Sequence, residues 1–173
     1  MRRISLFLML LTGLQWTACK GQPTGLVKDV SFDEMLAGML DSTQVSFLSV
    51  DQLHAQTSDF LILDARERAE YELSHIPGAV WVGYDDFNFD RIRNLTDEEP
   101  VVVYCSVGYR SEKVGQKLQE KFSTVYNLYG SIFEWANRSY PLVDMEGDST
   151  KTLHTYNKRW SKWVKNPSIQ KEY

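Results

Sequence analysis

The chain has 173 residues, of which 43% are hydrophobic and 24% charged. This composition provides material for one globular core and little beyond it, so a second full domain is not expected. The net charge of −4 supplies no basic face for phosphate backbones, and nucleic acid is therefore excluded as a partner.

The N-terminus has the pattern of an export signal, because two arginines precede a short apolar run over residues 4–14. The run is about half as long as a membrane-spanning helix. The small residues before Cys19 resemble a bacterial lipobox, although Trp16 stands where leucine is usual. We expect a signal peptide over residues 1–18 and lipidation at Cys19, giving an exported lipoprotein anchored to a membrane and facing the periplasm or the cell surface. Cleavage without lipidation, or an uncleaved anchor, stays open.

Three further segments follow the signal. Residues 19–28 are rich in turn formers and predict a spacer behind the lipidated N-terminus. Residues 29–145 are expected to form the domain, and residues 146–173 a C-terminal extension. The domain opens on an amphipathic helix over residues 29–40, where apolar side chains recur at helical spacing.

Strand and helix signals then alternate along the domain. Short apolar, often β-branched runs predict strands at residues 45–50, 60–63, 79–82, 101–104 and 124–128. Several runs are apolar throughout, as in parallel strands covered on both faces. Polar or amphipathic stretches lie between them at residues 67–73, 86–95 and 111–122. The alternation predicts an α/β fold with right-handed crossovers.

The C-terminal extension mixes basic and aromatic residues. Leu153, Tyr156, Trp160 and Trp163 are separated by three or four positions, a spacing typical of a helix. We expect these rings to pack on the domain while the lysines reach solvent. A role at a membrane surface, or as a lid near the reactive loop, is the alternative.

The strongest candidate for chemistry is Cys105, which follows the strand predicted at residues 101–104. Ligands collect at the carboxyl ends of parallel strands. Gly108 allows the following loop to turn through positive φ, and Ser111 is a capping-type residue at the start of the next helix. Inward-facing amides and a helix N-terminus would lower the pKa of the thiol, and Arg110 adds a positive charge suited to an anion. A buried, inert cysteine is the alternative.

The segment from Tyr104 to Ser111 resembles the active-site loop of single-domain rhodaneses. Residues 63–66, Leu-Asp-Ala-Arg, and residues 71–79, Tyr-Glu-Leu-Ser-His-Ile-Pro-Gly-Ala, are similar to the first signature of that family. Its second signature resembles residues 128–135, with Ser131 where a second glycine is common. The resemblance covers residues 45–143 and implies a rhodanese-like, three-layer fold in which helices flank a five-stranded parallel sheet.

The resemblance also implies site roles. Cys105 would be the sulfur-accepting nucleophile, and Asp64 and Arg66 are candidates for bracing its loop, although a structural salt bridge is an equal alternative for Asp64. Glu70 is interpreted as a surface or bracing charge, and His75 as a structural part of a turn. The expected cradle for the anionic substrate or persulfide consists of five residues: Ser106, Val107, Gly108, Tyr109 and Arg110.

The implied activity is sulfurtransfer from thiosulfate or a persulfide donor, through a persulfide on Cys105, to cyanide or a thiol. The implied partners are a small sulfur-containing anion or a protein persulfide, and no metal or organic cofactor is required. A persulfide carrier without turnover, or a binding module, is an alternative. A cysteine-based phosphatase or arsenate reductase is a weaker one, because phosphatase loops place five residues between cysteine and arginine and this loop has four.

Overall fold

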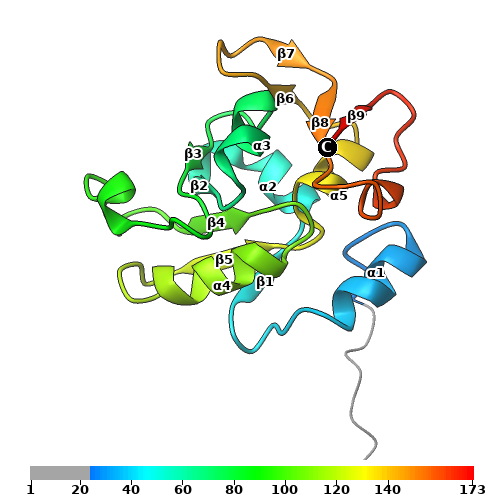
Figure 1. Ribbon diagram of the computed structural model, residues 1–173. Helices are drawn as coiled ribbons and strands as arrows, with labels where there is room; N and C mark the ends of the chain where they lie inside the picture. The colour runs from blue at the N-terminus through cyan, green and yellow to red at the C-terminus, as the bar shows by residue number, and fades with distance from the viewer. Residues whose placement is uncertain (1–23) are drawn as a thin grey trace, which may run out of the picture.

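A computed structural model describes residues 24–173 (Figure 1). Its centre is a five-stranded parallel sheet in the order β1-β5-β4-β2-β3. The strands are β1 (Ser46–Leu48), β2 (Leu61–Asp64), β3 (Val80–Trp81), β4 (Val101–Tyr104) and β5 (Val125–Leu128). The predicted five-stranded parallel sheet is therefore confirmed, with each strand inside or close to its predicted range.

Helices cover both faces of the sheet, which gives the three predicted layers. The helices are α1 (Val30–Ala37), α2 (Val50–Ala55), α3 (Arg68–Leu73), α4 (Tyr109–Leu118) and α5 (Ser131–Asn137). One core unites α1, α2 and α5 with one face of the sheet, and a second core packs α4 on the other. In β4, Val102 and Val103 belong to opposite cores, because successive strand side chains point to opposite faces.

Two predicted helices differ in the structure. The helix predicted from Ser111 begins at Tyr109, and its N-cap is Gly108. Residues 86–95 contain only a short 3-10 helix, η2 (Phe89–Ile92). There the side chain of Asn88 accepts a hydrogen bond from the amide of Asp90, and such local side-chain bonds favour turns over longer helices.

The C-terminal extension is not the helix that its spacing suggested. It contains β7 (Ser149–Thr150), β8 (Thr152–His154), the 3-10 helix η3 (Ser161–Trp163) and β9 (Gln170–Glu172). β7 pairs with β6 (Leu142–Val143), and β8 pairs with β9. The helical spacing was misleading because Leu153 is a buried strand residue while Trp163 lies in η3.

The extension packs against the domain at two places. β8 lies beside α3. The ring of Trp163 stacks on Phe32 of α1, with centroids 5.2 Å apart. The expectation that the extension packs on the domain therefore holds for Leu153 and Trp163.

The start of the described chain is more ordered than a spacer. Asp29 caps α1 by accepting from the amides of Ser31 and Phe32. Before it, Val27 is buried, and the amide of Gly25 donates to Asp33, so residues 24–28 pack on the domain.

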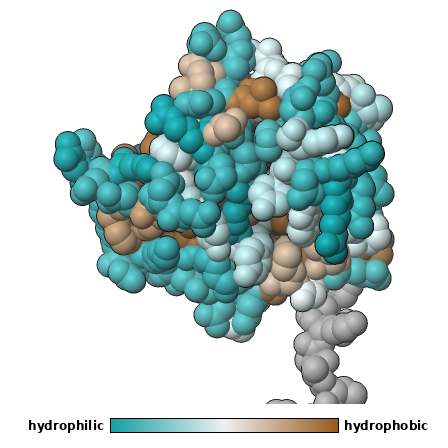
Figure 2. Space-filling view, in the orientation of Figure 1, coloured by the Kyte–Doolittle hydropathy of each residue, from teal (hydrophilic) through white to brown (hydrophobic). Residues whose placement is uncertain are grey.

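The predicted signal peptide, Cys19 and the first half of the spacer lie outside the described residues. Within residues 24–173, no helix has the length and apolar character needed to span a membrane. The face seen in Figure 2 is mostly hydrophilic, with hydrophobic residues in small scattered groups.

Candidate active site

Cys105 lies at the carboxyl end of β4, the middle strand of the sheet, as predicted. β4 is flanked by β2 and β5, so loops from three adjacent strands surround the thiol. Gly108 adopts φ 124°, and a Cβ there would lie 2.8 Å from Leu40 Cδ1. The loop therefore requires glycine at this position both for its backbone conformation and for space.

Cys105 is buried, with 1% of its surface exposed, and its sulfur forms no disulfide within residues 24–173. Its Sγ accepts a hydrogen bond from the amide of Gly108 at 3.2 Å and from the hydroxyl of Ser111 at 3.5 Å. The single proton of the Ser111 hydroxyl is shared with two further acceptors, Oδ1 of Asn127 on β5 at 2.7 Å and the carbonyl of Gly108 at 3.1 Å. Ser111 is thus not the N-cap expected from the sequence; it lies in the first turn of α4 and is aimed at the sulfur.

The second-signature loop supports Cys105 from the other side. Gly130 and Ser131 both have positive φ, 75° and 51°. The Ser131 hydroxyl accepts from the amide of Cys105 at 3.2 Å and donates to the carbonyl of Leu128 at 3.0 Å. These hydrogen bonds help to hold a serine in a left-handed conformation that ordinarily favours glycine.

The electrostatic surroundings favour a thiolate. Burial raises the pKa of the Cys105 thiol, but the positive charge of Arg110 and the hydrogen bonds from Ser111 and Gly108 outweigh it and lower the pKa below its usual value. The sulfur also lies at the N-terminus of α4, where unpaired amides favour negative charge. The sequence-based expectation of an activated thiol agrees with this geometry.

Arg110 is held by a carboxylate that the sequence did not place in the site. Its two terminal nitrogens donate to Glu70 of α3 at 2.6 and 2.9 Å, and Nη2 also donates to Ser106 Oγ at 2.9 Å. Burial raises the pKa of Glu70, but the hydrogen bonds and charge of Arg110 outweigh it and lower that pKa. Glu70 is only 2% exposed, so it is a buried brace for Arg110 and not a surface charge.

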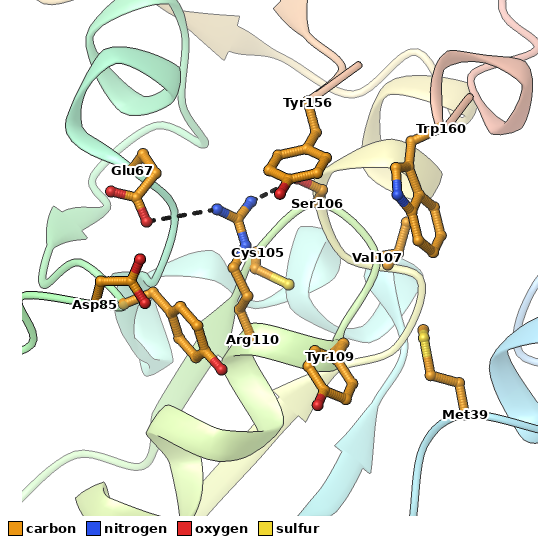
Figure 3. Close-up of a pocket in the computed structure, with 11 residues that line it drawn as sticks. Met39, Glu67, Asp85, Cys105, Ser106, Val107, Tyr109, Arg110, Tyr156 and Trp160 are labelled. Carbon is orange, nitrogen blue, oxygen red and sulfur yellow. Dashed lines mark hydrogen bonds and ion pairs between the residues drawn. The ribbon is translucent and has the colours of Figure 1, made fainter. Parts of the chain in front are cut away.

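A pocket of about 540 Å³ opens in front of the thiol. Tyr156 lies over the guanidinium of Arg110, with its ring centroid 5.4 Å from Cζ, as Figure 3 shows. The lining residues come from the segment after α1, the start of α3, the loop after β3, the Cys105 loop with the first turn of α4, and the C-terminal extension. They are Met39, Glu67, Tyr84, Asp85, Cys105, Ser106, Val107, Tyr109, Arg110, Tyr156 and Trp160.

Comparison with known families shows which family the sequence around this site belongs to. The model of the rhodanese-like domain matches residues 49–138, which is more than half of the chain. The chain belongs to the rhodanese-like domain family.

Relatives and solved structures of this family agree. A sulfurtransferase of Allochromatium vinosum is 33% identical over 100 residues, which cover 57% of this chain and 92% of that protein. A tRNA uridine(34) hydroxylase of Yersinia pestis is 30% identical over 122 residues, covering 65% of this chain but 32% of that protein. The solution structure of a rhodanese-like domain from Anabaena superposes with TM-score 0.53 at 22% identity, covering 57% of this chain and 79% of that one.

Asp64 and Arg66 of this rhodanese-like domain approach the start of the reactive loop at Tyr104, whose ring centroid lies 5.6 Å from Cζ of Arg66. They form a fully buried ion pair at 2.6 Å, and Arg66 donates to the carbonyl of Ser74 at 2.6 Å. The structural salt bridge given as the alternative for Asp64 is therefore present, and it ties the end of β2 to the turn after α3; neither side chain hydrogen-bonds to residues 105–110. His75 is structural, as interpreted: its ring stacks on Tyr71 and its amide donates to Val143.

Two supports of the reactive loop escaped the sequence analysis, Asn127 on β5 and the contact of Ser111 with the sulfur. Glu70 fits the bracing alternative given for it, and Tyr156 fits the lid alternative given for the extension. Trp160 lines the pocket as the lid alternative suggested, whereas Trp163 does not. Among residues 24–173, no group of three histidine, cysteine, aspartate or glutamate side chains is arranged to hold a metal ion.

Proposed function

We propose that this rhodanese-like protein is a sulfurtransferase that carries sulfane sulfur on Cys105. The observation on which the proposal depends is the buried thiol held by Gly108 and Ser111 beside Arg110, with its pKa lowered. Family membership and the sulfurtransferase relative support the same chemistry.

The proposed reaction has two displacements at sulfur. The Cys105 thiolate attacks the outer sulfur of thiosulfate or of a persulfide. The sulfur–sulfur bond of the donor breaks, and sulfite or a thiolate leaves with its electron pair. An acceptor nucleophile such as cyanide or a thiol then attacks the outer sulfur of the Cys105 persulfide and releases the Cys105 thiolate. Each step moves one sulfur atom and needs no external oxidant.

The loop is suited to hold the persulfide anion. The amides of Ser106 and Val107 make no hydrogen bond to another residue of the described chain, and those of the first turn of α4 have no partner within the helix. Preorganised amides of this kind stabilise negative charge without a general base beside the nucleophile.

Intact mass spectrometry tests the proposal directly. After incubation with thiosulfate or a persulfide donor and removal of excess donor, the wild-type chain should gain the mass of one sulfur atom, and Cys105→Ser should not. With cyanide present, the wild type should release thiocyanate. Ser58→Ala, at an exposed hydroxyl before the amino end of β2, is the control and should behave as wild type. If neither adduct nor product appears with either donor class, the proposal is wrong.

The rival functions give different results in the same preparation. A carrier without turnover would acquire the sulfur but release it only to a protein partner, so small acceptors would leave the adduct in place. A phosphatase would hydrolyse aryl phosphates in a vanadate-sensitive manner. The four-residue spacing between Cys105 and Arg110 favours sulfur over phosphate, since a tetrahedral phosphate needs a wider loop.

We also propose that the protein is exported and tethered to a membrane through a lipid on Cys19. The proposal depends on the charged and apolar pattern of residues 1–18 and on the small residues before the cysteine. Palmitate labelling of cells expressing the chain should be lost in Cys19→Ala and retained in Cys105→Ser. Labelling that persists in Cys19→Ala contradicts the proposal.

A further inference from the structure

The pocket in front of Cys105 has two chemically different sides (Figure 3). On one side lie the carboxylates of Glu67 and Asp85, and on the other lie Val107, Trp160 and Met39. Burial raises the pKa of Glu67, and the neighbouring carboxylates of Asp85 and Glu70 raise it further against the opposing charge of Arg110. The two carboxylates, placed together, make this side of the pocket acidic.

Arg110 offsets this charge only in part: its Nη1 lies 3.9 Å from Oε1 of Glu67, the ion pair dashed in Figure 3. Both of its terminal nitrogens are bound to Glu70, and the face of its guanidinium lies beneath the ring of Tyr156. Among the described residues that line the pocket, Arg110 is the only one with a positive charge. A dianion such as thiosulfate would meet two carboxylates and one arginine that is already paired, an arrangement that disfavours its binding.

The apolar side is suited to an organic molecule. The volume of about 540 Å³ falls within the range of roughly 300–1,000 Å³ that is typical of sites for organic ligands. Trp160 and Tyr109 present ring surfaces that an apolar body can cover, and Met39 adds an adaptable thioether. A small inorganic anion would leave this surface uncovered.

Tyr156 and Trp160 of the C-terminal extension cover the pocket and are called its roof below. The backbone of Tyr156 has an unusual conformation. It has φ 64°, a left-handed conformation that non-glycine residues adopt rarely and at a cost. Its ring is half exposed and points over the pocket. A strained residue that roofs the reactive thiol indicates a role in substrate recognition.

We propose that the sulfur compound recognised by this pocket is an organic thiol or its persulfide, neutral or positively charged, with an apolar body. The proposal rests on sulfur transfer at Cys105 and selects the organic class among the donors and acceptors considered above. The apolar body lies against Trp160 and Tyr109, beneath Tyr156, and a basic group faces Glu67 and Asp85. The organic thiolate attacks the outer sulfur of the Cys105 persulfide, the sulfur–sulfur bond breaks, and the products are an organic persulfide and the Cys105 thiolate.

Acceptors of similar size and different charge test the electrostatic half of the proposal. The full chain is loaded with sulfur by polysulfide, checked by intact mass, and mixed at low ionic strength with cysteamine, mercaptoethanol or mercaptopropionate. The measured quantity is the ratio of the transfer rates for cysteamine and mercaptopropionate. In the double variant Glu67→Gln/Asp85→Asn this ratio should fall at least about tenfold, because two nearby negative charges are lost. Because the same two thiols are used with wild type and variant, differences in their intrinsic reactivity cancel when the two rate ratios are compared.

The matched control is Glu98→Gln/Glu99→Gln. It changes the net charge equally, but both residues lie just before the amino end of β4, whereas Cys105 follows its carboxyl end. Its ratio should stay within about twofold of wild type, because distant exposed charges are screened. A ratio that is unchanged in the pocket variant, or equally lowered in the control, overturns the proposed charge preference.

The aromatic half is tested by truncating the roof. Tyr156→Ala and Trp160→Ala should each slow transfer to phenylethanethiol relative to mercaptoethanol by about tenfold. Tyr173→Ala removes an exposed ring outside the pocket and should leave the ratio unchanged. An equal loss for both acceptors, or no loss, overturns the role assigned to these rings.

The two proposals fail in distinguishable ways. If polysulfide, thiosulfate and organic persulfides all leave the mass of the chain unchanged, sulfur transfer at Cys105 is wrong, and the substrate class is wrong with it. If the persulfide forms and is transferred, but mercaptopropionate is preferred over cysteamine by the wild type and the pocket variant alike, only the substrate class is wrong.

Discussion

Arg110 stands between two negative groups, the carboxylate of Glu70 and the thiolate of Cys105. Replacing it with glutamine removes the charge that lowers the thiol pKa. Thiolate formation should then move to higher pH, and iodoacetamide labelling at neutral pH should slow severalfold, because only the thiolate reacts. Arg110→Lys keeps the charge and should shift the labelling profile less. Identical pH profiles for wild type and Arg110→Gln would contradict the role of this charge.

Glu70 links the site to acid stability. Its pKa is lowered in the folded protein, so its contribution to stability is fully present above the unfolded value near 4.5 and is lost as the pH falls through the lower folded value. Glu70→Gln should lower the melting temperature at neutral pH, because Arg110 loses its partner, and the difference from wild type should shrink in acid. Glu72→Gln, an exposed residue of the same helix, should show neither effect.

At the scale of single residues, the sequence identified the reactive group but not its supports. Cys105, Gly108 and Arg110 are contiguous, so one motif contains them. Glu70 and Asn127 reach the loop from elements far away in the chain, and their positions depend on how α3 and β5 pack beside β4. No local pattern encodes such a contact, so an isolated glutamate in α3 was equally compatible with a surface charge.

Among the structural elements, the loop between β4 and α4 depends most on one residue. Gly108→Ala should destabilise the fold by about 2–3 kcal/mol, through a strained φ and a collision with Leu40. Urea denaturation measures the loss. Gly147→Ala, which also has positive φ but meets open space, should cost only about 1 kcal/mol. Equal losses for both variants would mean that the collision with Leu40 does not matter.

The elements differ in how far they could be predicted. Strands were found because residues 101–104 and their neighbours are apolar and β-branched throughout, and burial on both faces requires this composition. The extension was mistaken for a helix because its apolar spacing matched one. Its strands are only two or three residues long, too short for an alternating pattern, and β8 is fixed by pairing with β9 and packing on α3.

For the whole molecule, the extension is expected to stabilise the fold as well as to shape the pocket. Trp163→Ala removes the ring stacked on Phe32 and should destabilise the protein by about 2 kcal/mol, less than for a fully buried tryptophan, because the ring is partly exposed. Urea denaturation measures the free energy of unfolding of this variant and of the control Tyr173→Ala. The control should lie within about 0.5 kcal/mol of wild type. Wild-type stability in Trp163→Ala would mean that the extension packs only loosely.

The position of Tyr156 and Trp160 in the chain has a consequence for synthesis. Synthesis runs from the N-terminus, and Cys105 precedes the residues that roof it by a long stretch of sequence. Cys105 is therefore synthesised before Tyr156 and Trp160, and in the unfinished chain its sulfur is exposed to oxidants. Oxidative damage at Cys105 should accumulate chiefly in chains caught before the roof has closed.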